Sequence, residues 1–100
     1  MIATVYAVFA DEAEAERIAA NVVEERLAAC ANILAPCRSI YRWKGAIERA
    51  REVPVLFKTA NADALIARIA ELHSYDVPAA VAWAVTTAHP PYNEWVLQNS

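Results

Sequence analysis

The sequence predicts an α+β fold of the ferredoxin-like type, with the element order β-α-β-β-α-β and a short helix after the last strand. Three observations carry this prediction. Apolar, β-rich stretches occur four times; two stretches with helical spacing separate the first from the second and the third from the fourth; and the only glycine lies between the second and third. This is the split βαβ order. We expect one sheet of strand order 4-1-3-2 with both helices on one face.

The first strand and the first helix have the clearest signals. Residues 2–9 are almost wholly apolar and rich in β-formers, which indicates a central strand. Asp11, followed by Glu14 three positions later, gives a capping-box pattern with Asp in the place of Ser or Thr. The apolar stripe that follows predicts a helix over residues 12–29.

A long β-hairpin is predicted next. Residues 32–43 form a β segment that Pro36 interrupts, because proline cannot donate a hydrogen bond to a neighbouring strand. The Lys-Gly pair at 44–45 marks the turn, and the return strand covers residues 47–59. The charged first part of that strand, residues 48–52, is expected to project beyond the sheet as a solvated stem.

The second half of the chain repeats the helix–strand order. Asn61 is a suitable cap for a helix over residues 62–72. Residues 77–87 have the composition of a last strand, and two consecutive prolines end it. The tail, residues 92–99, has the spacing of a short helix.

Length and composition indicate one domain, residues 1–100, that needs partners. Apolar residues make up 58% of the chain, whereas soluble domains usually have about 45–50%. A single core of this size cannot bury such a surplus. The face of the sheet without helices is also predicted to be apolar. We therefore expect that face to lie in a subunit interface.

Charge and hydropathy exclude several classes of function. The net charge of -3 argues against nucleic-acid binding, which depends on neutralising phosphates with Lys and Arg. No apolar run approaches the roughly 20 residues of a membrane span. The first residues carry no basic leader of the kind that precedes a signal peptide, so the expected location is the cytoplasm. Cys30 and Cys37 are seven positions apart, form no Cys-x-x-Cys motif and are expected to be buried free thiols.

Several short strings occur in order along nearly the whole chain. They are Glu25 to Cys30 with Asn32 and Ile33, Ser39 to Tyr41 with Trp43 and Gly45, and Leu72-His73 with Tyr75 and Val77-Pro78. Together they resemble the CutA family of divalent-cation tolerance proteins. The resemblance implies a homotrimer of ferredoxin-like domains whose long hairpins reach neighbouring subunits, an assembly similar to that of PII signalling proteins. It also implies tolerance of divalent metals and copper binding.

Cys30 and His73 are the candidate metal ligands, because other thiols or histidines proposed for copper in the family are not reproduced here. A thiolate is a soft ligand suited to Cu(I) or Zn, although a small buried residue at a helix end is the alternative for Cys30. His73 follows the second predicted helix, where the helix dipole stabilises an imidazolium, so capping is its alternative role. Neither residue has a ligand-pair spacing. A metal site would have to be assembled across subunits.

A second group of polar or amphipathic side chains lies among apolar strands. Its members are Asn32, Tyr41, Trp43, Glu48, Lys58 and Tyr75. Buried polar groups need partners, so this group predicts either a satisfied interface network or a small-molecule cleft between subunits.

No catalytic constellation is present. The sequence has no nucleophile elbow, Gly-rich phosphate loop or Walker motif, so we expect no enzymatic activity. Three functions remain: a trimeric divalent-cation tolerance protein that binds copper or another divalent ion, a PII-like module that binds a small effector at subunit clefts, and a structural trimeric scaffold.

Overall fold

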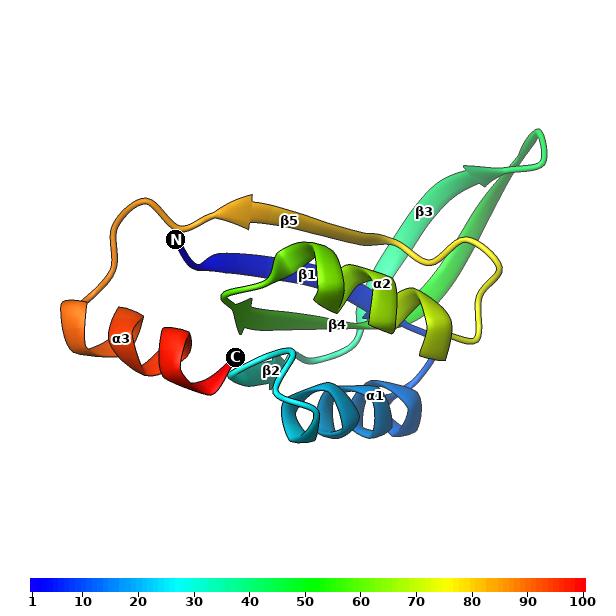
Figure 1. Ribbon diagram of the computed structural model, residues 1–100. Helices are drawn as coiled ribbons and strands as arrows, with labels where there is room; N and C mark the ends of the chain where they lie inside the picture. Colours follow the sequence, from blue (N-terminus) through cyan, green and yellow to red (C-terminus); the bar gives the residue numbers. More distant parts are fainter.

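The computed structural model describes all 100 residues as five strands and three helices (Figure 1). In chain order they are β1 (Ala3–Phe9), α1 (Glu12–Glu24), β2 (Cys30–Ile33), β3 (Cys37–Trp43), β4 (Ala46–Thr59), α2 (Ala62–Leu72), β5 (Ala80–Ala84) and α3 (Pro90–Asn99).

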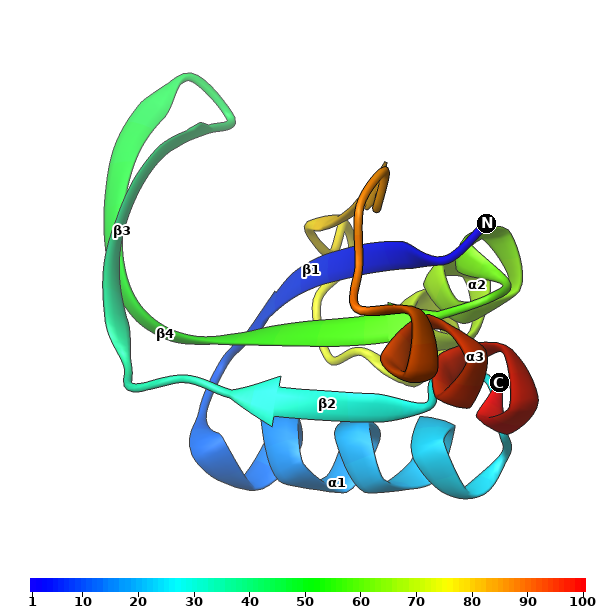
Figure 2. The same cartoon turned by 90° about the vertical axis from the view of Figure 1, so that its left-hand side faces the viewer.

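The strands form one antiparallel sheet of order β2-β4-β1-β5, and β3 pairs with the first half of β4. When β2 and β3 are counted as the one predicted segment, this is the expected 4-1-3-2 order. The α+β, ferredoxin-like prediction is therefore confirmed. Helices α1 and α2 cover one face of the sheet, which we call the helix face (Figure 2). The opposite face has no helix over most of its area, and we call it the open face.

The core lies between the helix face and the two helices. Alternate residues of β1 and their partners on β4 point toward the helices, namely Val5, Ala7 and Phe9 with Phe57, Val55 and Val53. Ile18 and Val22 of α1 and Leu65 and Ile69 of α2 complete this cluster. Since side chains alternate across a strand, Tyr6, Val8, Leu56 and Lys58 belong to the open face.

Helix α1 ends five residues earlier than predicted. Arg26 adopts a left-handed backbone conformation with φ of 61°. Its N–H donates to the carbonyl of Val23, and the N–H of Leu27 donates to that of Val22, both at 3.0 Å. These two bonds form a Schellman motif, which closes a helix and usually has glycine at the left-handed position. Because Arg occupies that position, no stop signal is visible there in the sequence.

The hairpin of β3 and β4 projects from the sheet and curves away from α1 and α2 (Figures 1 and 2). It contributes to dimensions of 45 × 25 × 23 Å for the chain. The break predicted at Pro36 separates β2 from β3. At the tip, Lys44 and Gly45 have φ of 50° and 82°. Positive φ at both central residues is the signature of a type I′ turn, which confirms the predicted turn.

The last strand is shorter than predicted, whereas the tail helix is longer. Strand β5 covers Ala80–Ala84, because residues 74–79 form a loop beside the base of the hairpin. Helix α3 begins at Pro90, since proline suits the first helical position. Its Val96 packs with Ile2 and Ala29 in a second small core, so α3 closes the end of the sheet where β1 begins. None of the three helices is long and apolar enough to span a bilayer.

Candidate functional site

The two candidate metal ligands lie on opposite faces of the sheet. Cys30 pairs with Lys58 on β4 and shares the open face with it. His73 stacks on Phe9, which belongs to the helix-face core, with ring centroids 4.9 Å apart. The ring also bonds to Val8, whose partner on β4 is Pro54. Because Pro54 and Lys58 are four residues apart, the two candidates are also separated by about 13 Å along the strand.

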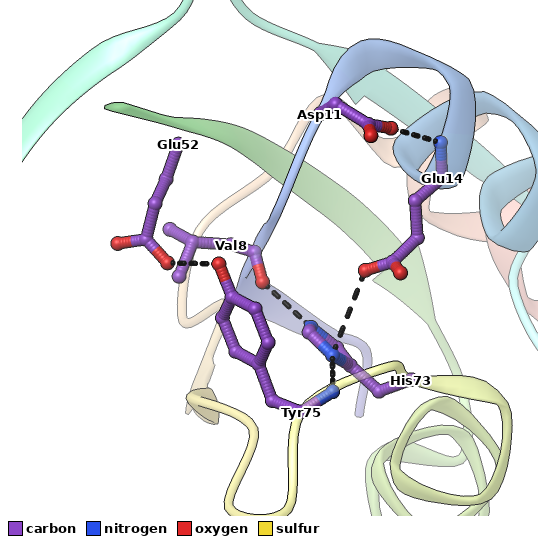
Figure 3. Close-up of polar contacts among 6 residues, drawn as sticks. All are labelled: Val8, Asp11, Glu14, Glu52, His73 and Tyr75. Atoms are coloured by element: carbon purple, nitrogen blue, oxygen red, sulfur yellow. Dashed lines mark hydrogen bonds and ion pairs between the residues drawn. The ribbon is translucent and has the colours of Figure 1, made fainter. Parts of the chain in front are cut away.

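His73 connects three segments of the chain (Figure 3). Its side chain is fully buried at the end of α2. Nε2 lies 2.8 Å from the carbonyl oxygen of Val8, and Nδ1 accepts the backbone N–H of Tyr75 at 3.1 Å. A nitrogen that accepts a hydrogen bond carries no proton, so the proton is on Nε2 and the ring is neutral. The expected cationic cap is therefore replaced by a neutral ring that holds the loop before β5 to the end of β1.

Glu14 of α1 faces the same imidazole. Its Oε1 lies 3.6 Å from His73 Nδ1 and accepts no hydrogen bond, although it is buried. The backbone N–H of Glu14 donates to Asp11 Oδ1 at 2.8 Å, which confirms Asp11 as the cap of α1, but the Glu14 carboxylate does not return a hydrogen bond to Asp11 as a capping box would. The hydrogen bond to Asp11 holds Glu14 in the first turn of the helix. Its carboxylate therefore lies against the His73 ring, which donates no hydrogen bond to it.

Cys30 contacts the terminal helix. Its Sγ lies 3.4 Å from the hydroxyl of Tyr92. Burial, and then the hydrogen bond with Cys30, raises the pKa of Tyr92 to about 12. Both cysteines are free and partly exposed, which corrects the expectation that they are buried. Cys37 lies on β3 opposite Glu52, whereas Cys30 lies opposite Lys58, six residues further along β4.

The residues of a single chain do not fit a metal ion. No group of three His, Cys, Asp or Glu side chains lies close enough to hold one. Both ring nitrogens of His73 already have hydrogen-bond partners. His73 therefore cannot serve as a second metal ligand beside Cys30, whose Sγ contacts Tyr92. A zinc site needs three or four such ligands, and a copper site at Cys30 would need at least one further soft or nitrogen ligand.

A groove of about 560 Å³ lies where the hairpin, the end of β1 and the loop before β5 meet. Its main walls are Tyr41 and Trp43 of β3 and Tyr75 of the loop, which are three of the predicted cleft residues. The other lining residues are Val8, Ser39, Glu52, Ser74, Asp76, Val77 and Ala79. The groove follows from the alternation of side chains, because the odd-numbered residues of β3 share a face with the even-numbered residues of β4.

Glu52 and Tyr75 form the polar centre of this groove (Figure 3). The hydroxyl of Tyr75 donates to Glu52 Oε2 at 2.9 Å. Burial, followed by this hydrogen bond, raises the pKa of Tyr75 well above its usual range. Burial together with the nearby Cys37 and Glu52 also raises the pKa of Tyr6. His73 supports the arrangement, since it binds the backbone N–H of the same tyrosine.

The other predicted cleft residues lie outside the groove. Asn32 and Lys58 are on the open face, on β2 and β4, and Glu48 is exposed on the hairpin opposite Tyr41. Glu52 was expected in a solvated stem, but only 6% of it is exposed, so that prediction was wrong. Because Glu52 ends a run of charged residues, no local signal in the sequence reveals its burial.

The topology, the projecting hairpin and the terminal helix define a ferredoxin-like α+β protein with an extended β-hairpin. Residues 3–99 match the family described as CutA1 divalent ion tolerance protein. The chain therefore belongs to the CutA1 divalent-ion tolerance family.

Individual relatives agree with this membership. The divalent-cation tolerance protein CutA of Pyrococcus horikoshii is 39% identical over 98 residues, covering 96% of this chain and 95% of that protein. Protein CutA of Mus musculus is 42% identical over 90 residues, covering 88% of this chain but 51% of that protein, so the chain spans about half the length of this relative. The solved structure of the divalent cation tolerance protein (Cut A1) of Thermus thermophilus superposes with a TM-score of 0.95 at 37% identity, covering 100% of this chain and 99% of that one.

Proposed function

We propose that this chain acts in tolerance of divalent cations as a homotrimer that shares the open faces of its sheets. The observation that carries the proposal is the apolar surface of the open face. Val81 and Trp83 of β5 are 54% and 51% exposed there, and Trp83 stacks with Tyr6 of β1. A sheet normally buries its apolar faces, and monomeric proteins rarely expose contiguous apolar patches of this kind.

The hairpin supports the same proposal. Ile40 and Ile47 are 66% and 51% exposed, and every residue from Ile40 to Arg49 is exposed in the single chain. A two-stranded hairpin is marginally stable in water without further packing. A neighbouring subunit would supply the missing surface. Free cysteines fit a reducing compartment, and cytoplasmic location is part of the proposal. The proposed role is binding and assembly, without catalysis.

The experiment tests assembly and tolerance together. The chain would be expressed in a bacterium that lacks its own protein of this family and is sensitive to copper, zinc or cadmium. We expect it to restore growth. The double variant Val81→Glu/Trp83→Glu should lose both the trimer and the restored growth, because charges on the open face prevent its burial. Val23→Glu is the matched control, since Val23 is exposed on α1. A monomeric double variant that still restores growth would contradict the proposal.

Copper binding by this chain is a prediction that rests on Cys30, because His73 is engaged at both nitrogens. As a soft ligand, Cys30 would need further ligands from other subunits. Titration of Cu(I) into the trimer and into Cys30→Ala tests this prediction. Equal affinity in both proteins would remove copper from the proposed function.

A second candidate is a PII-like regulatory module, which the groove beside the hairpin favours. The groove combines three aromatic side chains with a buried, hydrogen-bonded carboxylate, as small-molecule sites commonly do. A screen of metabolites by thermal shift of the trimer tests this candidate, because a ligand that binds the folded protein raises its Tm. The absence of any shift would favour the structural scaffold instead.

A further inference from the structure

The groove has a charge of one sign. Its two ionisable carboxyl residues are Glu52 and Asp76, and no Lys, Arg or His lines it. On the hairpin, the arginines Arg38, Arg49 and Arg51 lie on the opposite face from Glu52, because they alternate with the groove residues along both strands. A ligand of the groove should therefore carry positive charge.

Glu52 presents one free oxygen to the groove. Oε2 accepts the hydrogen bond from Tyr75. Oε1 accepts no hydrogen bond from the chain and is accessible to solvent. Figure 3 shows this second oxygen pointing away from Tyr75. Glu52 as a whole is 6% exposed, and its carboxylate is held by one fixed donor, so it is oriented before a ligand arrives. Orientation in advance lowers the cost of binding.

The remaining walls suit an organic cation. Tyr41, Trp43 and Tyr75 supply aromatic rings, which attract cations through their faces. Trp43 already makes such a contact, with Lys44 Nζ 5.9 Å from the ring centroid. A bare metal ion would need more oxygen, nitrogen or sulfur ligands than the groove has, since no three-residue ligand group exists in the chain.

We propose that this groove binds a small organic ammonium compound, with its N–H groups on Glu52 Oε1 and its carbon body against the aromatic walls. Asp76, which is exposed at the rim, adds attraction for the positive charge. The inference rests on the proposed function, because Tyr41 and Trp43 of the groove lie on the hairpin that a neighbouring subunit is proposed to contact, and the groove must stay open in the trimer. It names the chemical class of effector that the regulatory candidate would sense.

Isothermal titration calorimetry of the full-length protein in its assembled state tests the proposal. The ligand used is phenethylamine, and 2-phenylethanol is the uncharged control of nearly the same shape. We expect phenethylamine to bind and 2-phenylethanol to bind at least about tenfold more weakly, since a charge-assisted hydrogen bond changes affinity by about 10- to 100-fold. Glu52→Gln should lose affinity by a similar factor. This variant keeps an oxygen that accepts the Tyr75 hydroxyl, and Glu16→Gln on α1 is the matched control that should bind as the wild type does.

Four outcomes would overturn the proposal. The first is equal binding of the amine and the alcohol, and the second is unchanged affinity in Glu52→Gln. The third is binding of Zn²⁺ or Mn²⁺ that excludes phenethylamine. The fourth is dissociation of the trimer in Glu52→Gln without amine binding by the wild type, which would mean that a Lys or Arg of a neighbouring subunit fills the groove. Sedimentation of each variant separates these results from failure of the proposed function, because a trimer that does not bind the amine refutes the ligand alone.

Discussion

Replacement of His73 tests whether this side chain holds the loop before β5 to the end of β1. His73→Ala removes the partner of the Val8 carbonyl and the partner of the Tyr75 N–H. Each loss costs about 1–3 kcal/mol when the group stays buried. Loss of the stack on Phe9 adds about 0.5–1.5 kcal/mol. The free energy of unfolding should fall by about 2.5–7.5 kcal/mol, a large part of the 5–15 kcal/mol that a domain usually has.

A second variant separates the two hydrogen bonds. A glutamine side chain places its N–H₂ near the position of Nε2 of histidine, so His73→Gln can still donate to Val8 but cannot accept from Tyr75 at the same time. We expect it to lose about half as much stability as His73→Ala. Urea denaturation at one fixed protein concentration measures both variants, because the stability of an oligomer depends on its concentration.

Hydrogen exchange adds a local measurement. The amide of Tyr75 should lose protection in both variants, because its acceptor is removed, while the amides of α1 keep theirs. A loss of less than about 1 kcal/mol in His73→Ala, with the Tyr75 amide still protected, would refute this role of His73. A stability that depends on added copper or zinc would instead favour the metal-ligand interpretation.

Three further predictions concern Glu14, the hairpin turn and the buried tyrosines. Glu14→Gln should raise the free energy of unfolding by about 1 kcal/mol in urea denaturation, because it replaces a buried carboxylate that has an unpartnered oxygen with a neutral amide; a loss of stability would contradict this interpretation of Glu14. Gly45→Ala should cost about 1–2 kcal/mol in the same assay, because φ of 82° is strained for any residue with a Cβ; an unchanged midpoint would show that the turn adapts. The third prediction is a loss of stability at high pH, because burial is the main cause that raises the pKa of three tyrosines, Tyr6, Tyr75 and Tyr92. The unfolded chain releases these protons first, near pH 10, so stability should be constant up to that pH and fall as the pH rises toward 12. Tyrosinate absorbance that develops at the same pH in folded and unfolded protein would contradict it.

Local signals determined which elements could be predicted from the sequence. Helix α2 was predicted with its observed bounds because Asn61 caps it, accepting the N–H of Ala64 at 3.3 Å. The turn at Gly45 was predicted because it is the only glycine of the chain. The end of α1 was not, since Arg26 takes a conformation that glycine usually adopts and tertiary contacts compensate: its Nη2 donates to the Gln98 carbonyl at 2.6 Å.

The candidate site was predicted in part for a related reason. Tyr41, Trp43 and Tyr75 were singled out because amphipathic rings among apolar strands indicate a cleft or an interface, and all three line the groove. Glu52 was missed, because a charged residue beside Arg51 has the pattern of a solvated strand. Only the folding of the loop before β5 over the hairpin base buries it, and no local pattern shows that contact. The separation of Cys30 from His73 is likewise a property of the strand register.

Sedimentation velocity of the wild-type protein at micromolar concentration tests the claim that the open face and the hairpin are covered by other copies of the chain. We expect one species of about 33 kDa, three times the 11.0 kDa of the chain. Val81→Glu/Trp83→Glu should shift that species toward the mass of one chain. A wild-type protein that sediments as a stable, well-behaved species of 11.0 kDa would contradict the claim.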